Sequence, residues 1–301
     1  MSDHHHHHHH HEVSGKNLFI TIILNIIITL SQILGGIYSG SLALMSDAMH
    51  NLSDVMALFI AYFANRLAAR PNSEARTFGY KRAEILATLF NASVLIGIAV
   101  YLIIEAFHKF YHPEPIDSTW VIGLGVLSIL LNMASVFLIK DDAHHNMNIR
   151  AAYIHLLTDV MTSVAVVGGG LLMYYFGLFW VDPLISALIA LYLIWASFGL
   201  VRQSSAILMH FTPQEIDVCK VVDAIVEEDA IKNVHHVHIW KLDDNRIHFE
   251  AHLDFNEDVP LSVSNAVIEK LEKKLHDMFD VEHTTFQCEY ERDDNKNVVI
   301  L

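Results

Sequence analysis

Long apolar stretches follow one another through the first two thirds of the chain, separated by short polar segments. A helix that spans a lipid bilayer needs about 20 mostly apolar residues, and six stretches reach that length. The short connections at 39–41 and 177–183 predict tight hairpins. We therefore expect spanning helices at 18–38, 42–68, 83–110, 120–139, 149–176 and 183–203.

The last third of the chain has a different pattern. Residues 213–228 predict a helix with Thr212 as its cap and Pro213 in its first turn. Two segments then alternate between polar and apolar residues, as half-buried strands do, and a turn-like Asp-Asp-Asn joins them. An amphipathic helix and a last strand follow, and this order predicts a small α+β domain. The expected strands are 234–242, 246–255 and 281–290, and the expected helix is 261–279.

Composition supports a division into a lipid-embedded part and a soluble part. Hydrophobic residues make up 53% of the 301 residues and charged residues only 18%, and most of the net charge of −15 falls in 211–301. An acidic soluble domain argues against nucleic acid as a partner and suits cations. We divide the chain into a tail at 1–16, a transmembrane domain at 17–209, a soluble domain at 210–291 and a tail at 292–301, which we expect to fray.

Basic residues near the helix ends predict the orientation in the membrane, because cytoplasmic loops carry an excess of Lys and Arg. One set of ends carries only Lys109. The other set, which we therefore place in the cytoplasm with both termini and the soluble domain, carries Lys16, Arg66, Arg70, Arg76, Lys81, Arg82, Lys140, Arg150 and Arg202. The two cysteines, Cys219 and Cys288, are too few for a disulfide framework and suit a reducing compartment.

Histidines occupy every position from His4 to His11. This tract is either a purification tag or a native segment that gathers metal ions in the cytoplasm. Neither interpretation enters the predictions below.

Ionisable residues inside spanning helices cost several kcal/mol and are candidates for function. The second expected helix contains His50 and Asp54, and the fifth contains His155 and Asp159. A spacing of four residues places each pair on one helix face. Two imidazoles and two carboxylates match the tetrahedral preference of Zn²⁺, and the carboxylates neutralise its charge. The sequence thus predicts a metal site, although polar contacts between helices are the alternative.

Asp47 lies close to this pattern, on nearly the same face of the second helix as Asn51 and Asp54. A structural carboxylate that packs or caps and a proton-relay carboxylate are equally compatible with its position. Small residues such as Gly35 and Gly168 to Gly170 favour close helix packing in lipid, and the three consecutive glycines also allow a bend.

Four motifs give the chain a resemblance to a known family. They are the run from Ser41 to Asp54 (SLALMSDAMHNLSD), Thr77 to Glu84 (TFGYKRAE), His155 to Asp159 (HLLTD) and His238 to Trp240 (HIW). Together they resemble the cation diffusion facilitator transporters, in particular the zinc-type bacterial exporters, over residues 17 to about 290.

The resemblance implies a homodimer of six-helix protomers in the bacterial inner membrane, each with a ferredoxin-like cytoplasmic domain. It also implies exchange of Zn²⁺ for H⁺ by alternating access. The residues that match the transport site of the family are His50, Asp54, His155 and Asp159.

Two departures from the family pattern matter. Some members bind a second metal ion in the loop after the second helix, but Arg76 and Tyr80 stand here at the histidine positions, so we expect no such site. Some members also pair a basic residue at the start of the third helix with an aspartate after the sixth. Arg82 is present, but His210 stands where that aspartate is expected.

The soluble domain is rich in histidine. The resemblance points to His235, His252 and Glu289 as metal ligands, with His238 or His283 as further candidates. Zn²⁺ would then be both the transported substrate and a candidate regulator. Strand alternation predicts His236 and His238 on one face and His235 on the other. Solvated polar residues on a sheet are the alternative interpretation.

Other function classes fit the sequence less well. An intramembrane zinc enzyme usually leaves one coordination position open, and the chain has neither His-Glu-x-x-His nor a nucleophile elbow. We therefore expect a transporter and not an enzyme. The same transporter with Cd²⁺, Co²⁺ or Fe²⁺ as its main cargo, and a metal-sensing membrane protein, are the alternatives.

Overall fold

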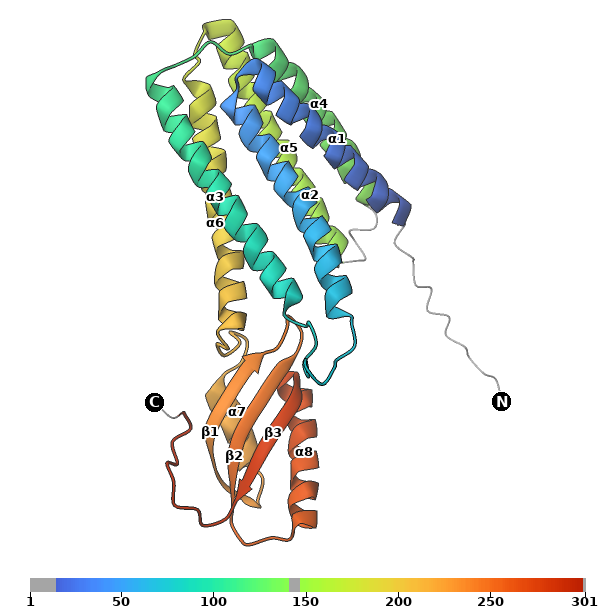
Figure 1. Cartoon of the computed structure of the whole chain (residues 1–301), viewed down its shortest axis with the longest axis vertical. Helices are drawn as coiled ribbons and strands as arrows, with labels where there is room; N and C mark the ends of the chain where they lie inside the picture. The colour runs from blue at the N-terminus through green and yellow to red at the C-terminus, as the bar shows by residue number, and fades with distance from the viewer. Residues whose placement is uncertain (1–14, 141–146, 300–301) are drawn as a thin grey trace, which may run out of the picture. The chain divides into compact units, whose positions relative to one another are not determined.

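The structure, a computed structural model, describes residues 15–140 and 147–299. The tract from His4 to His11 lies outside this range, as do the side chains of Lys16 and Arg150. Six long helices and a small α+β domain follow one another along the chain (Figure 1), as the sequence predicts. The helices are α1 (Gly15–Ser39), α2 (Leu42–Ala68), α3 (Ala83–Tyr111), α4 (Ser118–Ile139), α5 (Met147–Phe176) and α6 (Val181–Leu208).

Within the described residues, five helices are long and apolar enough to cross a membrane: α1, α3, α4, α5 and α6. The helix α2 has 27 residues, which is sufficient length. Asp47, His50 and Asp54 lower its apolar character. Such residues are tolerated in a spanning helix where they face the interior of the bundle, and in α2 all three are buried or half-buried. The prediction of a polytopic helical fold is confirmed.

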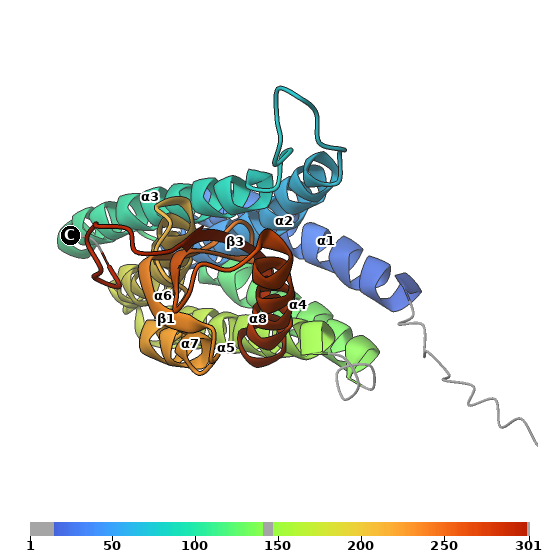
Figure 2. The ribbon, with the colours of Figure 1, turned by 90° about the horizontal axis from the view of Figure 1, so that it is seen from below.

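Close helix contacts use the small residues. The helix α4 packs against both α1 and α5 (Figures 1 and 2). A Cβ atom on Gly35 would lie 1.8 Å from Leu124 Cδ1, and one on Gly125 would lie 2.5 Å from Val167 Cγ2. Because a larger side chain would collide at both crossings, these glycines allow the helices to approach.

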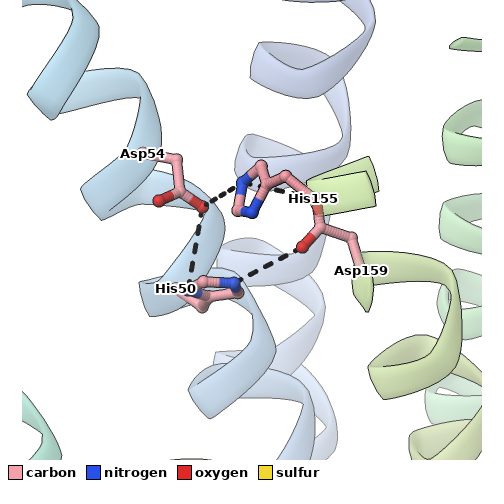
Figure 3. Close-up of side chains that lie close together, drawn as sticks. All are labelled: His50, Asp54, His155 and Asp159. Carbon is pink, nitrogen blue, oxygen red and sulfur yellow. Dashed lines mark hydrogen bonds and ion pairs between the residues drawn. The ribbon is translucent and has the colours of Figure 1, made fainter. Parts of the chain in front are cut away.

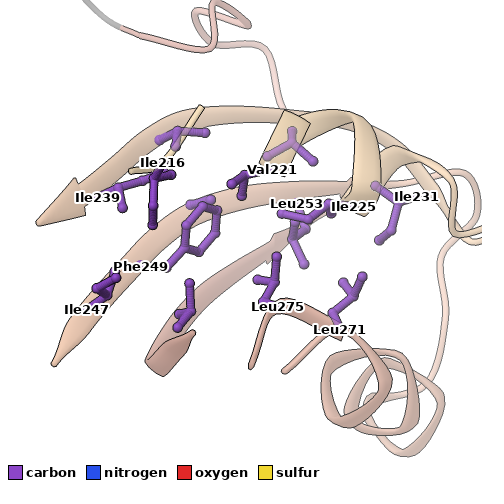
Figure 4. Close-up of a cluster of buried hydrophobic side chains, with 14 of the residues drawn as sticks. Ile216, Val221, Ile225, Ile231, Ile239, Ile247, Phe249, Leu253, Leu271 and Leu275 are labelled. Atoms are coloured by element: carbon purple, nitrogen blue, oxygen red, sulfur yellow. The ribbon is translucent and has the colours of Figure 1, made fainter. Parts of the chain in front are cut away.

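The C-terminal domain contains α7 (Val218–Val226), β1 (Ile231–Lys241), β2 (Ile247–Phe255), α8 (Leu261–Phe279) and β3 (Val281–Glu289). The sheet has the order β1-β2-β3, with β1 antiparallel and β3 parallel to β2. Figure 4 shows side chains of the strands, such as Phe249 and Leu253, packed against Leu271 and Leu275 of α8 and Val221 of α7. This apolar core holds the domain together.

The helix predicted at 213–228 is shorter in the structure. It begins at Val218, where the side chain of Asp217 accepts a hydrogen bond from the backbone N–H of Cys219 at 3.0 Å. Pro213 and Thr212 precede it as irregular chain. Aspartate is among the strongest N-cap residues, and a cap four residues inside the predicted helix explains the error.

The predicted alternation of the histidines in β1 is wrong at one point. A β-bulge shifts the register between His235 and His238, and His236 has a positive φ of 52°. His235 pairs with His252 and His238 pairs with Glu250, two positions apart on β2, so His235 and His238 lie on the same face of the sheet. A bulge inserts one residue into a strand and resets which side chains share a face.

The tail after the last strand is ordered over its described part. The backbone N–H of Val237 donates to the carbonyl of Val298 at 2.8 Å, and that of His236 donates to Asn297 at 3.2 Å. Residues 297 and 298 therefore pair with the free edge of β1, where we expected a frayed segment.

The chain divides into two compact units. One holds residues up to Phe59 together with Asn91–Phe198, and the other holds Ile60–Phe90 together with Gly199–Leu301. The boundary between residues 209 and 210 stays a prediction.

Candidate metal centre

The two His-x-x-x-Asp pairs of α2 and α5 meet in the structure. His50 Nε2 lies 3.4 Å from Asp159 Oδ1, and His155 Nε2 lies 3.2 Å from Asp54 Oδ2. Within each helix, the histidine and aspartate atoms are 3.7 Å apart on α2 and 3.8 Å apart on α5. Figure 3 shows the four side chains directed toward one another. One ligand atom from each residue lies within 4.8 Å of all the others. We call these four residues the intramembrane site.

The intramembrane site has donor atoms that suit a metal ion. Both ring nitrogens of His50 and both carboxylate oxygens of Asp159 are buried and have no hydrogen-bond partner among the described residues. A buried polar group without a partner is costly, and metal ligands are a common explanation for such groups. Two nitrogen and two oxygen donors around one point match the four-coordinate geometry that Zn²⁺ prefers.

Exposure changes across the intramembrane site. The side chains of His50 and Asp159 are 9% and 1% exposed, whereas those of Asp54 and His155 are 27% and 40% exposed. Asp54 is nearer the Ala68 end of α2, and His155 is nearer the Met147 end of α5. The two more exposed members of the site are thus the ones nearer the Ala68 end of α2 and the Met147 end of α5.

A buried polar network lies on the other side of the intramembrane site, with Asp47 at its centre. The carboxylate of Asp47 accepts hydrogen bonds from Gln32 of α1 at 2.5 Å, from Thr162 of α5 at 2.9 Å and from Ser163 of α5 at 3.1 Å. The same Thr162 hydroxyl lies 2.9 Å from the backbone carbonyl of Asp159, so the two acceptors share its one proton. Asp47 thus connects three helices one turn from the intramembrane site. The sequence left open whether this carboxylate is structural or relays protons, and the structure shows it hydrogen-bonded to two neighbouring helices.

A second cluster forms in the C-terminal domain. His235, His252 and Glu289, which the resemblance indicated, lie together, and Asp294 joins them. His252 Nδ1 is 3.0 Å from Glu289 Oε1, and His235 Nε2 is 3.5 Å from Glu289 Oε2. We call these four residues the C-terminal cluster. Its two imidazoles and two carboxylates repeat the donor set of the intramembrane site.

The two further candidate ligands lie elsewhere. The ring of His238 packs against that of His236, with centroids 5.0 Å apart, and His283 packs against His248 at 4.9 Å. Neither belongs to the C-terminal cluster as the structure has it. His283 and His248 instead continue an aromatic row that includes Trp240.

The two predicted departures have structural counterparts. In the loop after α2, the guanidinium of Arg76 lies over the ring of Tyr80 at 4.8 Å, and no metal-binding group was found there among the described residues. Arg82 contacts His210 Nε2 directly. Partial burial, and then the charge of Arg82, lowers the pKa of His210. A contact between Arg82 and His210 thus stands where some family members have an ion pair.

Sequence reasoning missed Gln32, Thr162 and Ser163 around Asp47, and Asp294 in the C-terminal cluster. A polar residue within an apolar run was the available signal for the first three. Asp294 gave no such signal, because acidic residues are common in polar tails.

Comparisons with known proteins agree with this geometry. Residues 18–209 match the family profile described as "Cation efflux transmembrane domain", and residues 213–291 match "Cation efflux protein, cytoplasmic domain". Together these profiles span most of the described chain.

Several curated bacterial proteins are similar along nearly their whole length. A "Cadmium, cobalt and zinc/H(+)-K(+) antiporter" of Bacillus subtilis is 33% identical, covering 95% of this chain and 93% of its own. The "Metal cation efflux system protein CzcD" of Cupriavidus metallidurans is also 33% identical (91% and 86% covered). The "Zinc transporter ZitB" of Escherichia coli is 31% identical (87% and 83% covered). The chain belongs to the cation efflux family, the cation diffusion facilitators.

Proposed function

We propose that this protein exports a divalent metal ion, Zn²⁺ in the first place, from the cytoplasm in exchange for protons. The observation that carries the proposal is the convergence of His50, Asp54, His155 and Asp159, whose ligand atoms lie within 4.8 Å of one another. The names of the relatives, which mention zinc, cadmium and cobalt, support a divalent cargo. Two imidazoles favour Zn²⁺ or Co²⁺ over Mn²⁺.

The excess of basic residues near one set of helix ends supports an orientation with that set in the cytoplasm. In this orientation, Asp54 and His155 are the cytoplasmic members of the intramembrane site, and they are also its more exposed members. We infer that the structure represents the state that opens to the cytoplasm. The network around Asp47 then closes the path on the outer side.

Proton coupling follows from the chemistry of the ligands. Imidazole and carboxylate must be deprotonated to bind a metal ion, so loading expels protons and protonation expels the metal. Histidine ordinarily titrates near pH ~6.5, within reach of cellular pH. Alternating access requires the facing ligands of α2 and α5 to be carried together between two states. In this proposal the membrane domain works as a homodimer, and Zn²⁺ at the C-terminal cluster is a regulator.

The test is metal uptake into proteoliposomes that contain the purified full chain and an imposed pH gradient. Zn²⁺, Cd²⁺, Co²⁺, Fe²⁺ and Mn²⁺ are compared. Asp159→Ala and His50→Ala should reduce zinc uptake to the level of empty liposomes. The matched controls Asp244→Ala and His112→Ala replace exposed residues and should transport like the unmodified protein.

Each alternative predicts a different result. A larger pH-driven flux of another metal would change the cargo and leave the site assignment intact. Zinc binding without flux would favour a metal-sensing membrane protein. Zinc uptake by Asp159→Ala at the unmodified rate would refute the proposed site.

A further inference from the structure

Lys296 lies in the middle of the carboxylates around the C-terminal cluster. Its ammonium is 2.6 Å from Asp294 Oδ1, 2.7 Å from Asp254 Oδ1 and 3.4 Å from Glu289 Oε2. Two of these three carboxylates, those of Glu289 and Asp294, belong to the cluster itself. The ammonium of Lys296 therefore lies among the carboxylate oxygens that could bind a metal ion.

The C-terminal cluster also contains a buried nitrogen donor. His235 is fully buried, and its Nδ1 has no hydrogen-bond partner among the described residues. Its ring is aimed at three carboxylates, with Nδ1 3.4 Å from Asp254 and Nε2 3.4 Å from Asp294 and 3.5 Å from Glu289. The ion pairs of Lys296 are with carboxylate oxygens, so this lysine leaves the imidazole nitrogen of His235, which a metal ion would bind, without a hydrogen bond.

The charges indicate that metal and Lys296 exclude each other. Three carboxylates, of Asp254, Glu289 and Asp294, face two cations, Lys296 and Arg292, which leaves one negative charge. A dication added to this set would make it positive, whereas a dication in place of Lys296 would make it neutral. The side chain of Lys296 is 35% exposed and can turn toward water.

The contacts of Lys296 with Asp254 and Asp294 are close ion pairs, at 2.7 Å and 2.6 Å. A metal ion that binds these carboxylates must therefore replace an ion pair that is already formed.

We propose that Lys296 is a tethered competitor that sets the metal affinity of the C-terminal cluster, and that a divalent cation binds there only by displacing its ammonium from Asp294, Glu289 and Asp254. This inference rests on the proposed regulatory metal and is independent of the transport site. The backbone pairing of Asn297 with β1 keeps the lysine next to the cluster. The competitor therefore acts at a high local concentration.

The first measurement uses the unmodified full chain in detergent and an amine-reactive acetylating reagent, with labelling of each lysine measured by mass spectrometry. Lys296 should label slowly without zinc and several-fold faster with saturating Zn²⁺. Lys270, which pairs with Glu228 on the surface away from the cluster, should label equally under both conditions. An unchanged labelling rate at Lys296, with zinc bound at the cluster, would contradict the displacement of Lys296 by zinc.

The second measurement is zinc affinity by calorimetry in a His50→Ala/His155→Ala background, which removes binding at the intramembrane site. Lys296→Met should bind Zn²⁺ about tenfold more tightly than this parent, because it removes a charge-assisted competitor. Lys296→Arg and Lys270→Met should retain the affinity of the parent. Equal affinity of Lys296→Met and the parent would contradict the proposal.

The outcome is separable from that of the transport proposal. Absence of zinc binding in both the parent and Lys296→Met would overturn this inference and make Lys296 a permanent counter-ion, whatever the flux assay gives. Loss of flux through Asp159→Ala would bear only on the intramembrane site.

Discussion

The side-chain amide of Gln32 on α1 donates a hydrogen bond to the carboxylate of Asp47 on α2, with the nitrogen and oxygen 2.5 Å apart. The carbonyl oxygen of the same amide accepts from Asn51 at 2.9 Å. All three residues are almost completely buried. One glutamine therefore hydrogen-bonds to two polar side chains of α2 and connects α1 to the helix that carries His50.

Gln32→Leu should destabilise the protein by about 1–2 kcal/mol, because it removes partners from two buried polar groups. The loss should be seen as a lower midpoint of thermal unfolding in detergent. Gln203→Leu replaces an exposed glutamine at the end of α6 and is the matched control. Equal midpoints for the two variants would show that the network around Asp47 contributes little to stability.

Two glycines of α5, Gly168 and Gly170, should respond in opposite directions to substitution by alanine. A Cβ atom on Gly168 meets nothing within 4 Å, whereas one on Gly170 would lie 2.9 Å from Ile122 Cγ1 and 3.3 Å from Val121 Cγ1. Gly168→Ala should stabilise the helix by up to about 1 kcal/mol, and Gly170→Ala should destabilise the bundle by about 1–3 kcal/mol. Unfolding midpoints test both, and a gain in stability for Gly170→Ala would contradict the packing interpretation.

Asp182 at the start of α6 caps α2 from outside that helix. Its carboxylate accepts from Ser41 Oγ at 2.5 Å and from the backbone N–H of Leu42 at 2.6 Å and Ala43 at 3.3 Å. Asp182→Ala should cost about 2 kcal/mol, at the upper end for a lost cap, because three donors lose their acceptor. Asp182→Asn keeps one oxygen and should cost less.

The exposed cap of α4 is the control for this pair. Asp117 accepts one hydrogen bond, from the backbone of Thr119 at 3.1 Å, and Asp117→Ala should cost about 0.5–1 kcal/mol. Chemical unfolding in detergent measures which of the two variants, Asp182→Ala or Asp117→Ala, loses more stability. A smaller loss for Asp182→Ala than for Asp117→Ala would show that the Asp182 contacts are not a cap of the stated strength.

His248 should make the protein less stable in mild acid. It is 7% exposed and packs on Trp240. Burial, followed by the charges of His283 and Arg246, lowers its pKa, although Asp243 and Glu282 oppose the shift. A histidine with a lowered folded-state pKa contributes stability above the unfolded value of about 6.5, and this is lost as the pH falls toward the folded value.

The variant His248→Phe should therefore lose less stability than the unmodified protein between pH 7.5 and pH 5.5. Thermal midpoints at several pH values measure the difference, and His112→Phe is the control for an exposed histidine. An identical pH dependence in His248→Phe and the unmodified protein would contradict the assignment.

The sequence predicted most of the fold because its strongest signals are local. Apolar runs of sufficient length identify α1 to α6 without any tertiary information. The helical repeat places His50 with Asp54 and His155 with Asp159 from spacing alone. That the two pairs face each other followed from chemistry, since four isolated ionisable groups in lipid would be too costly.

Two of the three errors arise where long-range contacts decide the structure. Nothing in the residues around His236 announces a bulge, which depends on how β1 pairs with β2. The order of residues 292–299 depends on Lys296 reaching Asp254, which lies 42 positions away in the sequence. The third error is local. The helix α7 begins after Asp217 and not at Pro213, because the hydrogen bond that the Asp217 side chain accepts at the N-cap favours a helix start more than the backbone angle of proline does.

The most direct test of the central claim is an anomalous diffraction map, recorded at the zinc absorption edge, from crystals of the full chain grown with Zn²⁺. We predict a peak between α2 and α5, about 2.0–2.2 Å from one atom each of His50, Asp54, His155 and Asp159. A zinc-saturated crystal with no anomalous peak between these helices, or with a peak held by other side chains, would contradict the claim.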